Sequence, residues 1–246
     1  MDSSMDSTLV RRLTPDDLTK ILDLQEVVTA RLSTGFLRLK SETDLRAFLD
    51  GTRGVAYGMM EGSALSALSL LRVPDEKHPN QGPPFPLVPT EDWPLSACLL
   101  ENTMVRPAAR GRGFQRRLFD VRISHAASAK MRWICAGVHL SNVVSWTNLL
   151  AKGMVIAGIR FDPGYPVLGL LGSLTSRALR SDATDQALVH PQDAASHQAA
   201  LEAGYIGVRL AADGDVVYER LRTSSPSRRS DAALARPETR TVVARL

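Results

Sequence analysis

The stretch VRPAARGRGFQ, residues 105–115, has the composition of an anion-binding turn. An extended apolar run ends at its valine, its proline turns the chain, and Gly111 and Gly113 come just before a helical pattern. Backbone N–H groups at the positive end of a helix bind anions, and glycines let a ligand approach the backbone closely. Arg110 and Arg112 add positive charge. The pattern predicts a cradle for a pyrophosphate, although arginine–glycine pairs also occur in ordinary turns and in RNA-binding segments.

Glu101 and His139 are the candidates for proton transfer. Glu101 lies inside the extended run CLLENTMV, just before the turn, where its carboxylate would face a cleft between separating strands and act as a base, directly or through water. The alternative is an ion pair between Glu101 and an arginine at the sheet edge. His139 ends the apolar run WICAGV, and histidine is a side chain well suited to proton transfer near neutral pH. Its alternative is a structural hydrogen bond to a backbone carbonyl.

Other reactive side chains fit a core better than a site. Cys98 and Cys135 lie inside apolar runs, which favours reduced, buried thiols over a disulfide or a zinc site. His125 falls on the apolar face of its helix and is expected to be structural. No metal is therefore predicted.

Periodicity and turn residues predict alternating strands and helices that build a mixed α/β fold. The expected strands are 9–13, 54–60, 64–73, 94–105, 131–138, 154–161, 205–210 and 216–221. The expected helices are 21–32, 41–50, 114–125, 142–152 and 190–204. A weak internal repeat with an offset of 51 residues matches Asn142, Ser145 and Gly153 with Asp193, Ser196 and Gly204.

Composition sets the domain limits. Half of the 14 prolines fall between Pro74 and Pro94, which predicts a long surface loop. The segment 223–246 is rich in Ser, Arg and Pro and is expected to be a disordered basic tail. Residues 1–222 are then one domain, with a core at about 9–160 and a C-terminal helix and hairpin at 190–222.

Charge and hydropathy exclude several classes of protein. The net charge is +4, and the tail holds five arginines against two acids, or +3, so the body carries 4 minus 3, or +1. With 5% aromatic residues, such a body offers no phosphate-neutralising face, and nucleic-acid binding is not expected. No run of 18 apolar residues exists, and the N-terminus carries acids where a signal peptide carries cations. We expect a cytoplasmic protein that does not bind membranes.

Two segments together give a family resemblance. VRPAARGRGFQRRL and, about 30 residues later, NVVSWTNLLAKGM resemble the acyl-CoA pyrophosphate loop and the following helix of the GCN5-related N-acetyltransferase (GNAT) superfamily. The resemblance covers about residues 9–159 and implies a twisted, mostly antiparallel central sheet flanked by helices. It implies acetyl-CoA as cosubstrate and direct attack of a neutral amine on the thioester. The residues that it assigns to CoA binding are Met104, Val105, Arg110, Gly111, Arg112, Gly113, Phe114, Gln115, Asn142 and Ser145.

The chain departs from the family pattern at two positions. Gln115 stands where the loop motif has its last small residue, and Leu149 stands where many members carry the tyrosine that protonates the departing thiolate. Tyr165 is a candidate for the missing acid. An N-acetyltransferase acting on a small amine or a peptide is the leading interpretation, with a homodimer left open. A catalytically silent acyl-CoA-binding regulatory module and an RNA-associated protein are the alternatives.

Overall fold

The computed structural model describes residues 9–30, 37, 39–79, 93–162, 165–175 and 179–222. In these residues the strands form a single ten-stranded sheet in the order β1-β2-β3-β4-β5-β7-β6-β9-β10-β8. Every pairing is antiparallel except the one between β4 and β5. The strands are β1 Leu9–Arg12, β2 Gly54–Glu61, β3 Ala64–Arg72, β4 Ala97–Val105, β5 Trp133–His139, β6 Val155–Asp162, β7 Tyr165–Ser173, β8 Ser181–Val189, β9 Tyr205–Leu210 and β10 Val216–Leu221. The expected mixed α/β fold with a mostly antiparallel sheet is confirmed.

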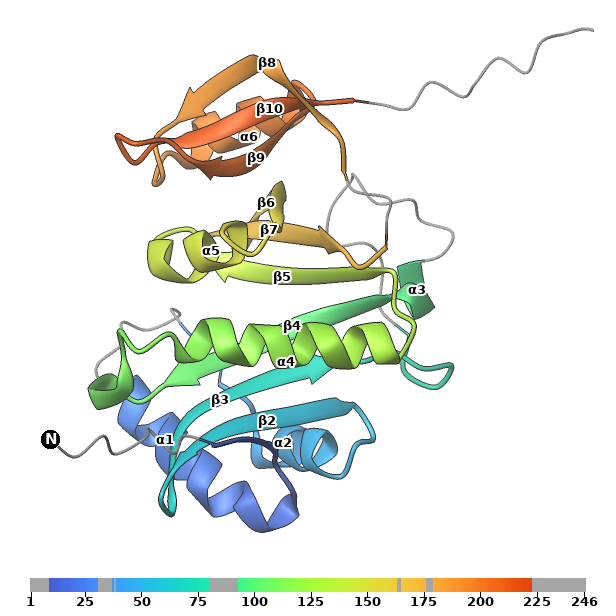
Figure 1. The fold of residues 1–246 in the computed structure, drawn as a ribbon, viewed down its shortest axis with the longest axis vertical. Helices are drawn as coiled ribbons and strands as arrows, with labels where there is room; N and C mark the ends of the chain where they lie inside the picture. The colour runs from blue at the N-terminus through green and yellow to red at the C-terminus, as the bar shows by residue number, and fades with distance from the viewer. Residues whose placement is uncertain are drawn as a thin grey trace, which may run out of the picture.

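Helices cover both faces of the first four strands (Figure 1). The α-helices are α1 Leu18–Thr29, α2 Glu42–Leu49, α3 Trp93–Ser96, α4 Phe114–Ser128, α5 Val143–Leu150 and α6 Ala194–Glu202. Side chains of β3 alternate between the faces: Leu68 and Leu70 pack in the cluster with α1 and α2, whereas Ala67 packs with α4. We call the first face the α1 face and the second the α4 face.

The parallel pair β4 and β5 separates along its length. The two strands are in register only from Ala97–Trp133 to Leu100–Ala136, and beyond that point β5 continues beside β7 alone. Figure 1 shows the strands adjacent where they begin and apart where they end. Because the sheet is interrupted there, backbone groups and side chains at the ends of both strands border an opening.

A bulge in β4 accompanies this separation. Ser69 pairs with Thr103 and Leu70 with Glu101, so Asn102 is an extra residue in β4. A bulge increases the local twist of a strand and redirects the side chains on either side of it. It lies next to the position where β4 leaves β5.

The C-terminal strands repeat the arrangement of the preceding ones. The unit β5-α5-β6-β7 has the sheet order β5-β7-β6, and the unit β8-α6-β9-β10 has the order β8-β10-β9. The two units meet edge to edge where Ile156 of β6 pairs with Gly207 of β9. Asn142 and Asp193 each cap their helix by accepting a hydrogen bond from the N–H of the serine three residues later. The offset of 51 residues in the sequence therefore corresponds to two similar supersecondary units.

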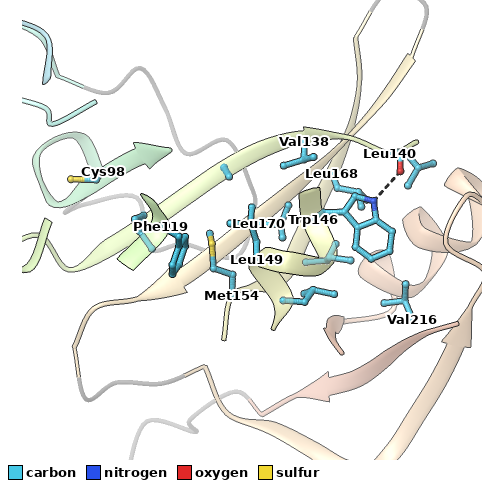
Figure 2. Close-up of a cluster of buried hydrophobic side chains, with 14 of the residues drawn as sticks. Cys98, Phe119, Val138, Leu140, Trp146, Leu149, Met154, Leu168, Leu170 and Val216 are labelled. Atoms are coloured by element: carbon cyan, nitrogen blue, oxygen red, sulfur yellow. Dashed lines mark hydrogen bonds between the residues drawn. The ribbon is translucent and has the colours of Figure 1, made fainter. Parts of the chain in front are cut away.

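Trp146 of α5 anchors the larger core cluster. Its indole is fully buried, and Nε1 donates to the carbonyl oxygen of Leu140 at 2.9 Å, as Figure 2 shows. Leu149 lies on the same helix within this cluster, with Leu168 and Leu170 of β7. This packing fixes α5 against the α4 face of the sheet, beside the point where β4 and β5 separate.

The structure agrees with some expectations about individual segments and differs from others. Both cysteines are free and buried, as predicted. His125 is partly buried and its Nδ1 lies 2.9 Å from the hydroxyl of Tyr57, which fits the structural role expected of it. Strands β7 and β8 were not predicted, and the sheet core continues past residue 160. The tail 223–246 and most of the proline-rich segment lie outside the described residues.

Candidate active site

The opening between β4 and β5 contains a cavity of about 370 Å³. Its wall includes the ends of both strands, part of α4 and α5, and the residues that precede α2. The lining residues are Leu37, Lys40, Arg72, Leu99, Leu100, Glu101, Asn102, Thr103, Gln115, Arg122, Cys135, Ala136, Gly137, Val138, His139, Asn142, Ser145, Leu149 and Arg160. Both predicted proton-transfer residues, Glu101 and His139, are among them.

Glu101 and His139 are on the same face of the sheet. Leu99 and Cys135 are partners across the β4–β5 pair, and side chains two residues apart on a strand share a face. Glu101 follows Leu99 by two residues, and His139 follows Cys135 by four. Leu70, the partner of Glu101 on β3, packs with α1 and α2, so this is the α1 face.

Glu101 is held by two cations. Its Oε2 pairs with Lys40 Nζ, and its Oε1 lies 2.6 Å from Nη2 of Arg72. The Glu101 side chain is only 11% exposed, so these ion pairs are shielded from bulk water. The ion pair that we considered as the alternative to a catalytic base is therefore present.

His139 is oriented by the turn that follows it. Its Nδ1 accepts a hydrogen bond from the backbone N–H of Ser141 at 3.1 Å and lies 2.7 Å from the hydroxyl oxygen of the same residue. Because Nδ1 accepts from a backbone N–H, the neutral imidazole carries its proton on Nε2. The ring stacks on Tyr165 of β7, with centroids 4.7 Å apart. In this geometry neutral His139 is a hydrogen-bond donor rather than a base.

A second cavity, of about 350 Å³, extends toward the start of α4. It shares five lining residues with the first, namely Leu37, Thr103, Gln115, Asn142 and Ser145. The rest of its wall is Val28, Met104, Val105, Arg110 and Val144. Six of the residues assigned to CoA by the sequence, Met104, Val105, Arg110, Gln115, Asn142 and Ser145, thus border one groove.

The glycine turn before α4 has the predicted geometry. Gly111 and Gly113 both adopt left-handed backbone angles, with φ of 78° and 74°, and Gly113 is the N-cap of the helix. No atom of the described residues lies within 4 Å of a Cβ built at either glycine. The turn therefore leaves open space at the positive end of a 15-residue helix, which favours anions.

The side chains around this turn divide into three groups. Arg110 lines the second cavity. Arg112 instead pairs with Glu61 at the β2–β3 hairpin and packs over the ring of Phe114. Phe114 is 2% exposed and belongs to the core cluster under α4. Arg112 and Phe114 therefore have only their backbone N–H groups to offer at the turn in this structure.

Side chains connect the starts of α4 and α5. Gln115 Nε2 donates to the hydroxyl of Ser145 at 3.0 Å, and its Oε1 accepts from Asn148 at 3.0 Å. Asn142 caps α5. Leu149 occupies the position where the family pattern has a tyrosine. Its side chain is 4% exposed and borders the first cavity from the core. Gln115 thus joins the two helices that form one side of the groove.

Four cations in the first cavity were not predicted: Lys40, Arg72, Arg122 and Arg160. Arg122 is 1% exposed, and its guanidinium reaches the carbonyls of Leu118, Leu70 and Glu101, each at 3.4 Å. Complete burial lowers the pKa of Arg122 to about 9, so the side chain remains a cation at neutral pH.

Arg122 could have been found from the sequence. It follows Leu118 and precedes Ala126 by four residues each, so it interrupts the buried stripe of α4. The other three cations come from different segments, and no motif connects them.

No three His, Cys, Asp or Glu side chains are placed to hold a metal ion within the described ranges. None of the helices in these ranges is both long and apolar enough to cross a membrane.

No family model matches the sequence, and no curated protein matches it. Solved structures do share its fold. A probable acetyltransferase from Staphylococcus epidermidis aligns over 68% of this chain and 99% of its own, with a TM-score of 0.55 at 15% identity. The GNAT domain of S. lividans PAT aligns over 68% of this chain and 90% of its own, with a TM-score of 0.51 at 18% identity. The protein has the GNAT fold.

A third structure of similar fold includes a ligand. The putative acetyltransferase yncA from Salmonella typhimurium, described with its cofactor acetyl-CoA, aligns over 72% of this chain and 99% of its own, with a TM-score of 0.54 at 13% identity. Since these structures cover about seven tenths of the chain, part of it has no counterpart in them.

Proposed function

We propose that this protein is an acyl-CoA-dependent N-acyltransferase that transfers acetyl from acetyl-CoA to an amine by direct attack. The observation that carries the proposal is the continuous groove that runs from Arg110 and Gln115, on either side of the left-handed glycine turn, to the opening between β4 and β5. Its Arg110 end suits a pyrophosphate, and its other end lies between the two strands. The GNAT fold and the acetyltransferase names of its structural neighbours support this function.

The CoA arm would follow β4. Arg106 N–H donates to Ser66, and hydrogen-bonding residues alternate along an antiparallel pair. The alternation predicts that the backbone N–H of Met104 also points toward β3, whereas the N–H groups of Thr103 and Val105 point toward the groove. Val105 is then a better donor to the pantetheine arm than Met104. Asn142 and Ser145 would border the same arm from α5.

The chemistry requires a neutral amine, a donor for the developing oxyanion and a proton for the departing thiolate. Acyl-CoA supplies the thioester carbonyl that the amine nitrogen attacks, and the C–S bond then breaks. Glu101 would accept the ammonium proton through water or position Lys40 and Arg72. His139, with its proton on Nε2, would donate a hydrogen bond to the developing oxyanion, and Tyr165 would hold the imidazole ring in place. The departing thiolate would take its proton from water.

A silent acyl-CoA-binding module is the second candidate, and Leu149 favours it. A buried leucine at this position cannot protonate a thiolate. This candidate predicts CoA binding without turnover.

One experiment separates the two candidates. Thiol release from acetyl-CoA is measured across a panel of amines, with acetyl-CoA binding measured by calorimetry on the same sample. An N-acyltransferase releases CoA only when a suitable amine is present and yields the acetylated amine by mass spectrometry. Binding without thiol release across the whole panel contradicts the enzyme and supports the silent module.

A further inference from the structure

We infer that the acceptor amine also carries a carboxylate or another anionic group within a few bonds of its nitrogen. This inference rests on the proposed function and names the class of acceptor. It is based on cations that reach the opening between β4 and β5 from both sides, on the α1 face of the sheet.

On the β5 side the cation is Arg160. Its backbone is in β6, yet its guanidinium crosses the intervening β7 and lies over Gly137 of β5. A Cβ built on Gly137 would be 3.4 Å from Nη1 and 3.6 Å from Nη2. Arg160 pairs with Asp162, and its side chain is 48% exposed, so a ligand in the cavity can reach it. A strand position without a side chain makes room for this guanidinium.

On the β4 side the cations are Lys40 and Arg72, which share the single carboxylate of Glu101. Arg72 Nε is buried and has no hydrogen-bond partner among the described residues. A buried N–H without a partner is costly, so this guanidinium is incompletely satisfied by the described residues. Arg72 is the β3 partner of Leu99, so it lies on the same face as Glu101.

The charges do not balance within the described residues. Among the described residues, Lys40, Arg72, Arg122 and Arg160 line the cavity, Glu101 is the one acid beside them, and Asp162 pairs with Arg160 from outside it. Four cations minus two acids leave +2. Arg122 contributes to this excess because its guanidinium hydrogen-bonds to backbone carbonyls rather than to an acid in the described part of the chain.

This excess selects among amines. An acceptor with several positive charges would be repelled, while an anionic group beside the amine would form charge-assisted hydrogen bonds. Because Arg160 and Arg72 flank the opening where the thioester is expected, the anionic group must lie close to the attacking nitrogen. An amino acid has this arrangement of charges.

Amino acids and their α-amides are the probe pairs, since the amide keeps the amine and the side chain but lacks the anionic group. Binding of each pair is measured by calorimetry on the full chain with saturating CoA, and acetylation is followed in parallel. We expect the carboxylate form of at least one pair to bind about tenfold or more tightly than its amide, as for a hydrogen bond between charged groups. Arg160→Gln should remove most of that preference.

Arg220→Gln is the matched control. Arg220 is also a strand arginine paired with an aspartate, with a 47% exposed side chain, and it lies outside the cavity. It should retain the full preference. Equal binding of acids and amides throughout the panel overturns the inference, and acetylation of the amides would then leave the proposed function intact. Binding that depends on the carboxylate without any acetylation overturns the proposed function and supports the anion site.

Discussion

The guanidinium of Arg160 lies over Gly137, although the two residues belong to β6 and β5 with β7 between them. Gly137 has no left-handed backbone angle, so a larger residue is allowed by its conformation and suits a strand. We predict that Gly137→Val leaves thermal stability unchanged or raised. Its γ-carbons should displace Arg160 and raise the acceptor KM roughly tenfold, as for a lost charged hydrogen bond. An unchanged KM would show that Arg160 does not contact the acceptor.

Glu101→Gln tests the carboxylate between Lys40 and Arg72. If Glu101 relays the ammonium proton, turnover should fall by about 10²- to 10⁴-fold, with a much smaller change in acetyl-CoA affinity. The defect should shrink as the pH rises, because more of the amine is then neutral. Glu219→Gln is the control, since Glu219 is a hydrogen-bonded strand glutamate in β10 outside the cavity. Full turnover of Glu101→Gln at neutral pH would place the base elsewhere.

His139 and Tyr165 can be separated by two substitutions. Tyr165→Phe keeps the stacked ring and removes the hydroxyl, so turnover should change less than about threefold if His139 is the donor. His139→Ala should lower kcat by about 10²-fold, as for the loss of one hydrogen-bond donor to the oxyanion, while acetyl-CoA affinity is kept. Steady-state kinetics with saturating acetyl-CoA measures both. A severe loss in Tyr165→Phe with normal turnover in His139→Ala would reverse the assignment.

Stability at mildly acidic pH depends on His197. This side chain is fully buried, its Nδ1 lies 2.7 Å from the Tyr218 hydroxyl, and burial lowers its pKa. The unfolded state then binds more protons than the folded state below about pH 6.5, so the free energy of unfolding should fall as the pH falls through that range. Thermal unfolding between neutral and mildly acidic pH should show a steeper decline for the wild type than for His197→Gln. Equal slopes would contradict this origin.

Local signals predicted much of this fold. The hairpin between β2 and β3, the glycine turn before α4 and the Asp-Gly turn before β10 are fixed by residues close together in the chain. β7 was missed because Val167–Gly172 is a short apolar run without alternation, typical of a strand buried on both faces. β8 was missed for the opposite reason, since its polar sequence SDATDQALV belongs to an edge strand.

The sequence predicted residues that line the groove, but it did not predict the charged side chains around the opening. Candidates such as Val105, Gln115 and Asn142 follow one another along a motif, and the structure brings them to one cavity wall. Arg72 and Arg160 are 88 residues apart in the sequence, and only the strand order and the empty position at Gly137 bring their charges to one opening. Such a site depends on tertiary structure, which periodicity does not report.

Acetyl-CoA binding to Gly113→Asp tests the central claim most directly. Asp tolerates a left-handed angle better than most residues, and no atom of the described residues crowds the site, so the fold should survive. Gly214→Asp is the matched control, because Gly214 also has a positive φ and open surroundings, but in the β9–β10 turn. We predict by calorimetry that wild type and Gly214→Asp bind acetyl-CoA alike, and that Gly113→Asp binds more than about tenfold more weakly because its carboxylate repels the pyrophosphate. A folded Gly113→Asp protein with wild-type affinity would contradict the account.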